Sequence, residues 1–136
     1  MNMPTHNIDM MIIETLQRLL QADINLELSV LVGSQASGSA KQDSDWDIAI
    51  RWHKVVKPSI GLEYSEILKQ KISDVVGIDK DKNDLIDIAT SHLAMKALIV
   101  EEGMILKGNE TLAWSHFVTQ TWAELEDRYW RKKHVA

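Results

Sequence analysis

Residues 45–52, with the sequence DWDIAIRW, constrain the fold most because two kinds of side chain alternate along them. Successive side chains of a β-strand point to opposite faces of the sheet. The alternation predicts a strand with Asp45 and Asp47 on one face and apolar side chains on the other, namely Trp46, Ile48, Ile50 and Trp52. Carboxylates are the hard oxygen ligands that Mg²⁺ prefers. The sequence therefore predicts a divalent-cation site on one face of a sheet.

A second predicted strand, at residues 26–32, ends directly before Gly33 and Ser34. Its side chains alternate at first between apolar and polar, and the Gly-Ser pair is typical of a tight turn into a short helix. Glycine lets a backbone approach phosphate closely, and a helix N-terminus offers free N–H donors. Ten residues separate Ser34 from Asp45. This arrangement predicts phosphate binding beside the two carboxylates.

The rest of the chain alternates between predicted helices and strands. A helix is predicted at residues 8–20 from its apolar spacing, and another between Pro58 and Gly77. The remaining predicted elements are a strand at residues 84–90, a helix at 91–102, a short strand at 104–106 and a helix from 110 to about 132. This order predicts an α/β (α+β) fold with a long C-terminal helix.

The third predicted strand contains two aspartates, and strand parity separates them. Asp84 shares its face with two isoleucines, whereas Asp87 shares its face with Leu85 and Ala89. Asp47 likewise shares its face with an alanine, so we expect Asp87 to be the third carboxylate of the site. The alternative is that Asp87 is a solvated edge residue, or a charge that favours the following helix.

The last predicted helix is rich in aromatic residues. Its apolar stripe, which we expect to pack in the core, consists of Trp114, Val118, Trp122, Leu125 and Tyr129. Phe117 and Trp130 lie outside the centre of this stripe and are candidates for contact with a partner protein. The basic residues at its end either complement the helix dipole or steer an acidic partner or RNA.

Composition limits the class of protein. A length of 136 residues predicts a single domain, at residues 1–136, with one core. The absence of cysteine excludes disulfides, thiol catalysis and zinc–thiolate sites. A formal net charge of −5 argues against generic nucleic-acid binding. With no leader-like segment and no apolar run of bilayer length, we expect a cytoplasmic protein that binds neither membranes nor nucleic acid directly.

The Gly33-Ser34 pair, the spacer and the Asp45-Trp46-Asp47 motif resemble the nucleotidyltransferase superfamily related to DNA polymerase β. The likeness covers about residues 26–107 and is greatest to the MNT (minimal nucleotidyltransferase) antitoxins. It implies a minimal polymerase β-like fold, with a small mixed sheet flanked by helices. It also implies that Asp45, Asp47 and Asp87 bind Mg²⁺ and act in catalysis, while Gly33 and Ser34 hold the phosphates of ATP.

The resemblance further implies an antitoxin that transfers AMP from ATP to a tyrosine of a HEPN ribonuclease toxin. Many relatives have arginines where this chain has Gln35 and Ser37, and this loss of charge weakens the case for nucleotide binding; Lys41 and Arg51 are candidate replacements. An ordinary salt bridge is the alternative for Arg51. Two other functions stay open: an antitoxin that acts by binding alone, through its last helix, and nucleotidyl transfer to a small molecule, as in aminoglycoside-modifying relatives. The lack of a second substrate domain counts against the latter.

Overall fold

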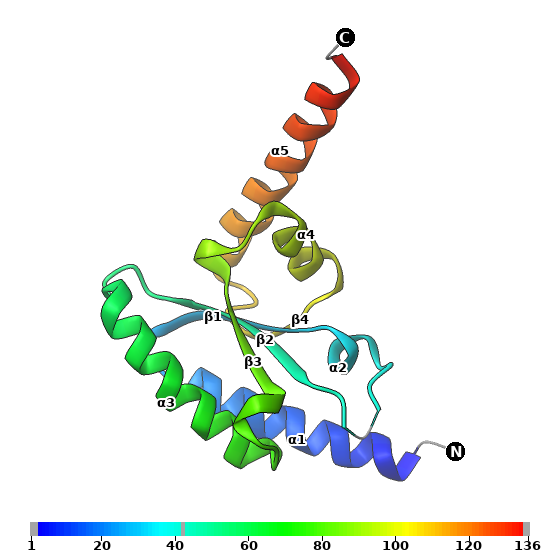
Figure 1. The fold of residues 1–136 in the computed structure, drawn as a ribbon, viewed down its shortest axis with the longest axis vertical. Helices are drawn as coiled ribbons and strands as arrows, with labels where there is room; N and C mark the ends of the chain where they lie inside the picture. The colour runs from blue at the N-terminus through cyan, green and yellow to red at the C-terminus, as the bar shows by residue number, and fades with distance from the viewer. Residues whose placement is uncertain (1–2, 42, 135–136) are drawn as a thin grey trace.

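A mixed four-stranded sheet, in the order β3-β2-β1-β4, forms the centre of the protein (Figure 1). The computed structural model describes residues 3–41 and 43–134, with side chains from residue 10 onward. The strands are β1 (Leu26–Val32), β2 (Trp46–Trp52), β3 (Asn83–Asp87) and β4 (Met104–Lys107). β1 pairs antiparallel with β2 and β4, whereas β2 and β3 are parallel. The predicted fold class is confirmed.

Helices cover both faces of this sheet (Figure 1). The helices are α1 (Met3–Gln21), α2 (Ser34–Ser37), α3 (Pro58–Val76), α4 (Leu93–Glu102) and α5 (Leu112–His134), with 3₁₀ turns η1 (Lys80–Lys82) and η2 (Ile88–Thr90). Pro58 starts α3, and Gly77 ends it in the left-handed conformation at φ 80°. No described helix is long and apolar enough to cross a bilayer.

The two faces of the sheet carry separate apolar clusters. On one face, leucines and isoleucines of α1 and α3 pack against the sheet, in a cluster that includes Leu16, Leu20, Trp46, Ile48, Ile50, Leu68 and Ile72. On the other face, α4 and the start of α5 cover a smaller cluster, which includes Leu28, Val30, Val32, Ala49, Ile88, Ile99 and Phe117. We call these the α1/α3 face and the α4/α5 face. Trp46, Ile48 and Ile50 of β2 lie on the first, as the alternation predicted.

β3 is shorter than predicted. The strand ends at Asp87, and residues 88–90 form η2 in place of further strand. The Asp87 carboxylate accepts a hydrogen bond from the Ala89 N–H at 3.0 Å, which caps this 3₁₀ turn. The sheet therefore stops where the predicted third strand was expected to continue.

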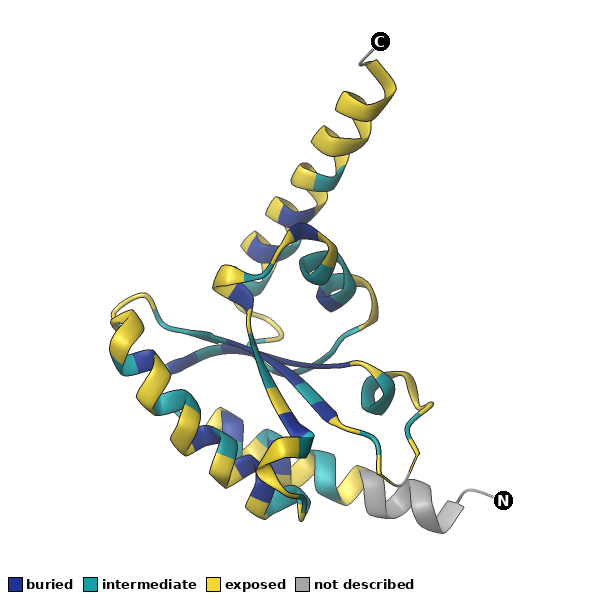
Figure 2. Cartoon of the chain, viewed as in Figure 1, coloured by how far each residue is buried: buried dark blue, intermediate teal, exposed yellow. Residues whose placement is uncertain are grey.

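α5 packs on the body only through its first turns and then extends away from it (Figures 1 and 2). The Thr111 hydroxyl accepts a hydrogen bond from the Trp114 N–H and caps the helix. Phe117 and Thr121 are buried, whereas Trp122 and Tyr129 are exposed. The prediction that the stripe through Trp122 and Tyr129 packs in the core is therefore wrong, because the distal half of the helix has no sheet beneath it.

Candidate active site

Three carboxylates lie together at one end of β2 and β3. Asp45 directly precedes β2, and Asp47 is the second residue of that strand. The parallel register pairs Asp47 with Asp84 of β3. Paired residues of adjacent strands point to the same face of a sheet, so Asp84 lies beside Asp47 on the α4/α5 face. Asp45 and Asp47 share this face, as the sequence predicted.

Asp87 lies elsewhere. The register pairs it with Ile50, three residues further along the ladder than the Asp47–Asp84 pair. Its carboxylate is engaged in the cap of η2. The expectation that Asp87 is the carboxylate beside Asp47 is therefore wrong. Parity separates the two faces within one strand, but the register between strands decides which aspartate is the neighbour of Asp47, and sequence reasoning missed Asp84 for this reason.

The electrostatics of Asp47 reflect this crowding. Burial raises the pKa of its carboxyl, and the charges of Asp84 and Asp45 raise it further. Among the described residues, no lysine, arginine or histidine forms an ion pair with any of the three aspartates. Like charges held together without a cation favour binding of a positive ion from solution.

The turn after β1 closes against the same carboxylates. Gly33 adopts φ 75° and ψ −155°, a conformation that is essentially restricted to glycine. A Cβ atom at Gly33 would lie 2.6 Å from Oδ2 of Asp47, so a larger residue has no room. The neighbouring Val32 pairs with Asp47 in the β1–β2 ladder, and Ser34 begins the single turn of α2. The predicted phosphate-binding pair and the predicted cation ligands are thus brought together.

The two residues that stand where the resemblance implies arginines make local contacts. Gln35 donates from Nε2 to the Ser44 carbonyl oxygen at 3.4 Å, and the Ser37 hydroxyl contacts the Ser34 carbonyl oxygen and Ser39. These bonds stabilise the loop between α2 and β2 but bring no positive charge to it.

Arg51 and Lys82 are two positively charged residues near β2 and β3, and they make different contacts. Arg51 pairs with Glu27, with Nε 3.5 Å from Oε1, which is the ordinary salt bridge considered as its alternative. Lys82, which sequence reasoning missed, donates from Nζ to the Asp43 carbonyl oxygen at 3.2 Å. Its sequence signal is its place two residues before Asp84.

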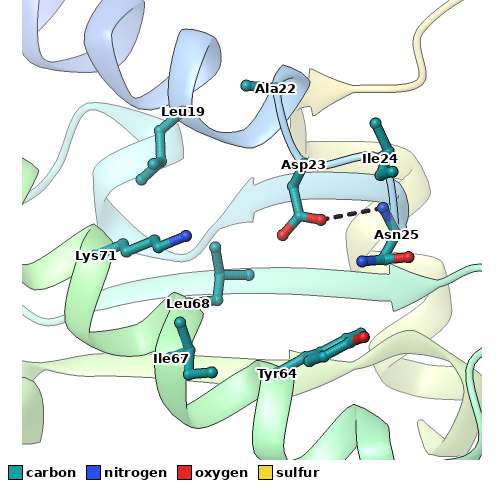
Figure 3. A pocket seen from close by; sticks show the side chains of 9 residues that line it. All are labelled: Leu19, Ala22, Asp23, Ile24, Asn25, Tyr64, Ile67, Leu68 and Lys71. Atoms are coloured by element: carbon teal, nitrogen blue, oxygen red, sulfur yellow. Dashed lines mark hydrogen bonds between the residues drawn. The ribbon is translucent and has the colours of Figure 1, made fainter.

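The site is an open edge of the sheet. A pocket of about 400 Å³ lies between the end of α1 and α3, where Asp23, Tyr64 and Lys71 line it (Figure 3). A second pocket, of about 550 Å³, lies at the far ends of β2 and β3 and includes Arg51 and Asp87. Neither pocket includes any of the three carboxylates.

The donor set fits magnesium held together with its substrate. Among the described residues, no three acidic, histidine or cysteine side chains are close enough to form a closed metal site by themselves. Mg²⁺ is usually bound by one or two carboxylates together with substrate phosphates and water. Asp45, Asp47 and Asp84 supply such carboxylates, and because Gly33 has no side chain its backbone lies beside Asp47.

Known proteins resemble the chain over most of its length. The family described as "Polymerase beta, Nucleotidyltransferase" matches residues 14–111, which include the carboxylates and the Gly-Ser turn. No curated protein matches the chain. Among solved structures, a mutant of the toxin-antitoxin MntA-HpeT has a TM-score of 0.67 at 22% identity, covering 89% of this chain and 93% of that chain.

Two further solved structures share the fold. A toxin-antitoxin with AMP-PNP has a TM-score of 0.64 at 23% identity, covering 90% of this chain and 91% of that chain. The complex of a tri-AMPylated Shewanella oneidensis HEPN toxin with an MNT antitoxin has a TM-score of 0.63 at 20% identity, covering 92% and 93%. At this level of identity the likeness establishes the fold.

Proposed function

The chain belongs to the polymerase β nucleotidyltransferase family, and on this premise we propose that it is an antitoxin that transfers AMP from ATP to a tyrosine of a HEPN toxin. The observation that carries the proposal is the meeting of Asp45, Asp47 and Asp84 beside the Gly33 turn. Structures of the same fold contain AMP-PNP in one case and an AMPylated HEPN toxin in another. The proposal assigns to this chain both an adenine nucleotide as co-substrate and a HEPN toxin as the protein that is modified.

The transfer requires charge neutralisation and alignment. Asp45, Asp47 and Asp84 would hold Mg²⁺, which supplies the positive charge that a triphosphate needs when it is attacked. The Gly33 backbone lies next to Asp47. In this proposal it holds phosphate oxygens together with the hydroxyl of the following Ser34. The tyrosine oxygen forms a bond to the α-phosphorus, and the bond from this phosphorus to pyrophosphate breaks. Asp84, an exposed carboxylate of β3, accepts the tyrosine proton.

The added group gives a physical reason for neutralisation of the toxin. A phosphodiester of AMP places a negative charge on the toxin. RNA binding depends on attraction between its phosphates and positive protein groups. A new negative charge near such groups therefore repels the substrate of a ribonuclease toxin.

The distal half of α5 supports a protein partner. Trp122, Tyr129 and Trp130 are 46%, 56% and 54% exposed on a helix that extends from the body (Figure 2). Aromatic side chains are enriched among the residues that carry binding energy in protein interfaces. We assign this surface to the HEPN toxin, consistent with the toxin-antitoxin complexes that share the fold.

The test is the intact mass of the cognate HEPN toxin after incubation with this protein, Mg²⁺ and ATP. We expect added mass in whole AMP units, and none with the Asp45→Asn/Asp47→Asn double variant. Asp79→Asn with Asp81→Asn is the matched control, because it removes two exposed carboxylates at the same spacing. Unmodified toxin after incubation with folded wild-type protein, Mg²⁺ and ATP would contradict the transfer.

A second candidate function, inhibition by binding alone, is favoured by the same exposed aromatic residues of α5. In that case the double aspartate variant keeps its protection of cells, while Tyr129→Ala with Trp130→Ala loses it. Val55→Ala with Leu62→Ala serves as control, because both side chains are exposed outside α5. For the transferase, both the aspartate and the aromatic variants lose protection.

A further inference from the structure

Lys82 lies at the open end of the carboxylate edge. Trp46 pairs with Asn83 and Asp47 pairs with Asp84, so the residue before Asn83 is level with Asp45. Asn83 points toward α3, because its Nδ2 donates to the Lys69 carbonyl oxygen at 2.9 Å. The ammonium of the adjacent Lys82 reaches the loop that leads to Asp45, where it contacts the Asp43 carbonyl oxygen.

The contact of Lys82 leaves binding capacity unused. Its Nζ donates to the Asp43 carbonyl oxygen at 3.2 Å, and within residues 10–41 and 43–134 no carboxylate lies at ion-pair distance from it. An ammonium carries three N–H donors. The nearby Lys80, in contrast, forms an ion pair with Glu66, with Nζ 3.3 Å from Oε2. Lys82 is thus a positive charge at the loop that leads to Asp45, and among the described residues none of the three carboxylates forms an ion pair with it.

A triphosphate at this edge needs such a charge. The three aspartates bring negative charge to the edge, and Gln35 and Ser37 supply no cation on the side of the α2 turn. Lysine binds phosphate as a point charge and does not require the fixed fork of an arginine. Tethering of its ammonium to Asp43 holds the charge near the site before a ligand arrives.

We propose that Lys82 binds the β- and γ-phosphates of the nucleotide and stabilises the pyrophosphate that leaves, in the place of the family's missing arginines. This inference rests on the proposed nucleotidyl transfer. It makes a prediction that the transfer alone does not: the variant protein should discriminate less between a nucleoside triphosphate and a nucleoside monophosphate.

The experiment is calorimetric titration of the full chain with ATP and, separately, with AMP, in the presence of Mg²⁺. Lys82→Gln removes the charge but keeps a donor for the Asp43 carbonyl oxygen, Lys82→Met removes both, and Lys82→Arg keeps both. Lys80→Gln is the control, because it removes the same charge two residues earlier. Thermal unfolding of each variant verifies that it is folded.

We expect Lys82→Gln and Lys82→Met to weaken ATP binding about 10- to 100-fold. AMP binding should change less than about twofold, and Lys82→Arg and Lys80→Gln should stay within about threefold of wild type for ATP. Equal losses for ATP and AMP, or wild-type affinity of Lys82→Gln, would overturn the inference and leave Lys82 as a tether of the loop. Wild-type protein that binds no ATP would instead overturn the proposed function itself, and the inference with it.

Discussion

The two faces of the sheet are covered to different extents, and β2 belongs to both. On the α1/α3 face its side chains Trp46, Ile48 and Ile50 are all buried. On the α4/α5 face Ala49 is buried, but Asp47 is half-buried and Asp45 is exposed. The covering helices therefore end between Ala49 and Asp47. The proposed site therefore lies where an otherwise buried strand emerges from the helices that cover it.

This difference makes the two sets of side chains separable by mutation. Apolar burial contributes free energy in proportion to the area removed from water. Carboxylates held together are instead unfavourable to the fold until a cation binds. Changes on the α1/α3 face should affect folding first, and changes at the carboxylate edge should affect transfer first.

The largest expected effect is on transfer, at the carboxylate edge. Asp84→Asn removes the neighbour of Asp47 and the proposed proton acceptor, so we expect the rate of AMP transfer to fall by about 10²- to 10⁴-fold. Asp87→Asn, which changes the same strand, should change the rate less than about threefold and only weaken the η2 cap. Initial rates from toxin mass spectra measure both. A larger loss for Asp87→Asn would restore the assignment made from sequence parity.

The next effect concerns the covered face. Ile48→Ala removes a side chain that is 0% exposed, and we expect it to lower the free energy of unfolding by about 2–5 kcal/mol. Ile24→Ala, at a position that is 83% exposed at the rim of the pocket in Figure 3, should stay within about 0.5 kcal/mol of wild type. Urea denaturation compares the two. Similar losses for both would mean that the α1/α3 face is less completely packed than its burial indicates.

Substitution at Gly33, in the turn between β1 and α2, is expected to change the free energy of unfolding less than Ile48→Ala does. Gly33→Ala places a Cβ atom at 2.6 Å from Asp47 Oδ2 in a backbone conformation that disfavours it, and should cost at least about 1–3 kcal/mol. Gly38→Ala also has a positive φ, 79°, but nothing lies within 4 Å of its Cβ position, so it should cost only about 1 kcal/mol. The same denaturation measurement tests this. Equal costs would show that the approach of Asp47, as distinct from the backbone angle, contributes nothing.

Local patterns predicted most of the elements and one half of the site. The alternation in residues 45–52 assigned the faces of β2, because the period of a strand depends only on its own backbone. Gly33 was found because a strand that ends in Gly-Ser is itself a local signal. Gly77 likewise marked the end of α3.

What failed depends on contacts between elements. Asp84 was passed over for Asp87 because pairing register is set by neighbouring strands and by where β3 ends, neither of which parity reports. The buried side of α5 was predicted wrongly because the helix leaves the body after Thr121. Its apolar residues continue at helical spacing beyond that point, but no other element packs against them. Phe117, expected outside the stripe, is the residue that the sheet in fact buries.

The smallest expected effect is a gain in folding stability when Asp47, a residue of the proposed site, is replaced. Burial and the charges of Asp84 and Asp45 raise the pKa of Asp47 above its ordinary value of 3.8, so its ionised form disfavours the folded state. This loss of stability develops as the pH rises from the ordinary pKa through the raised one and persists at neutral pH.

Asp47→Asn removes this loss of stability and should raise the melting temperature by roughly 1–3 °C at pH 7 without Mg²⁺. The advantage should vanish below about pH 3.8, where Asp47 is protonated in both the folded and unfolded states. Added Mg²⁺ should stabilise wild type and reduce the difference, because a ligand that binds only the folded state stabilises it. A variant that melts below wild type at pH 7 would mean that the Asp47 carboxylate contributes a favourable contact to the empty site.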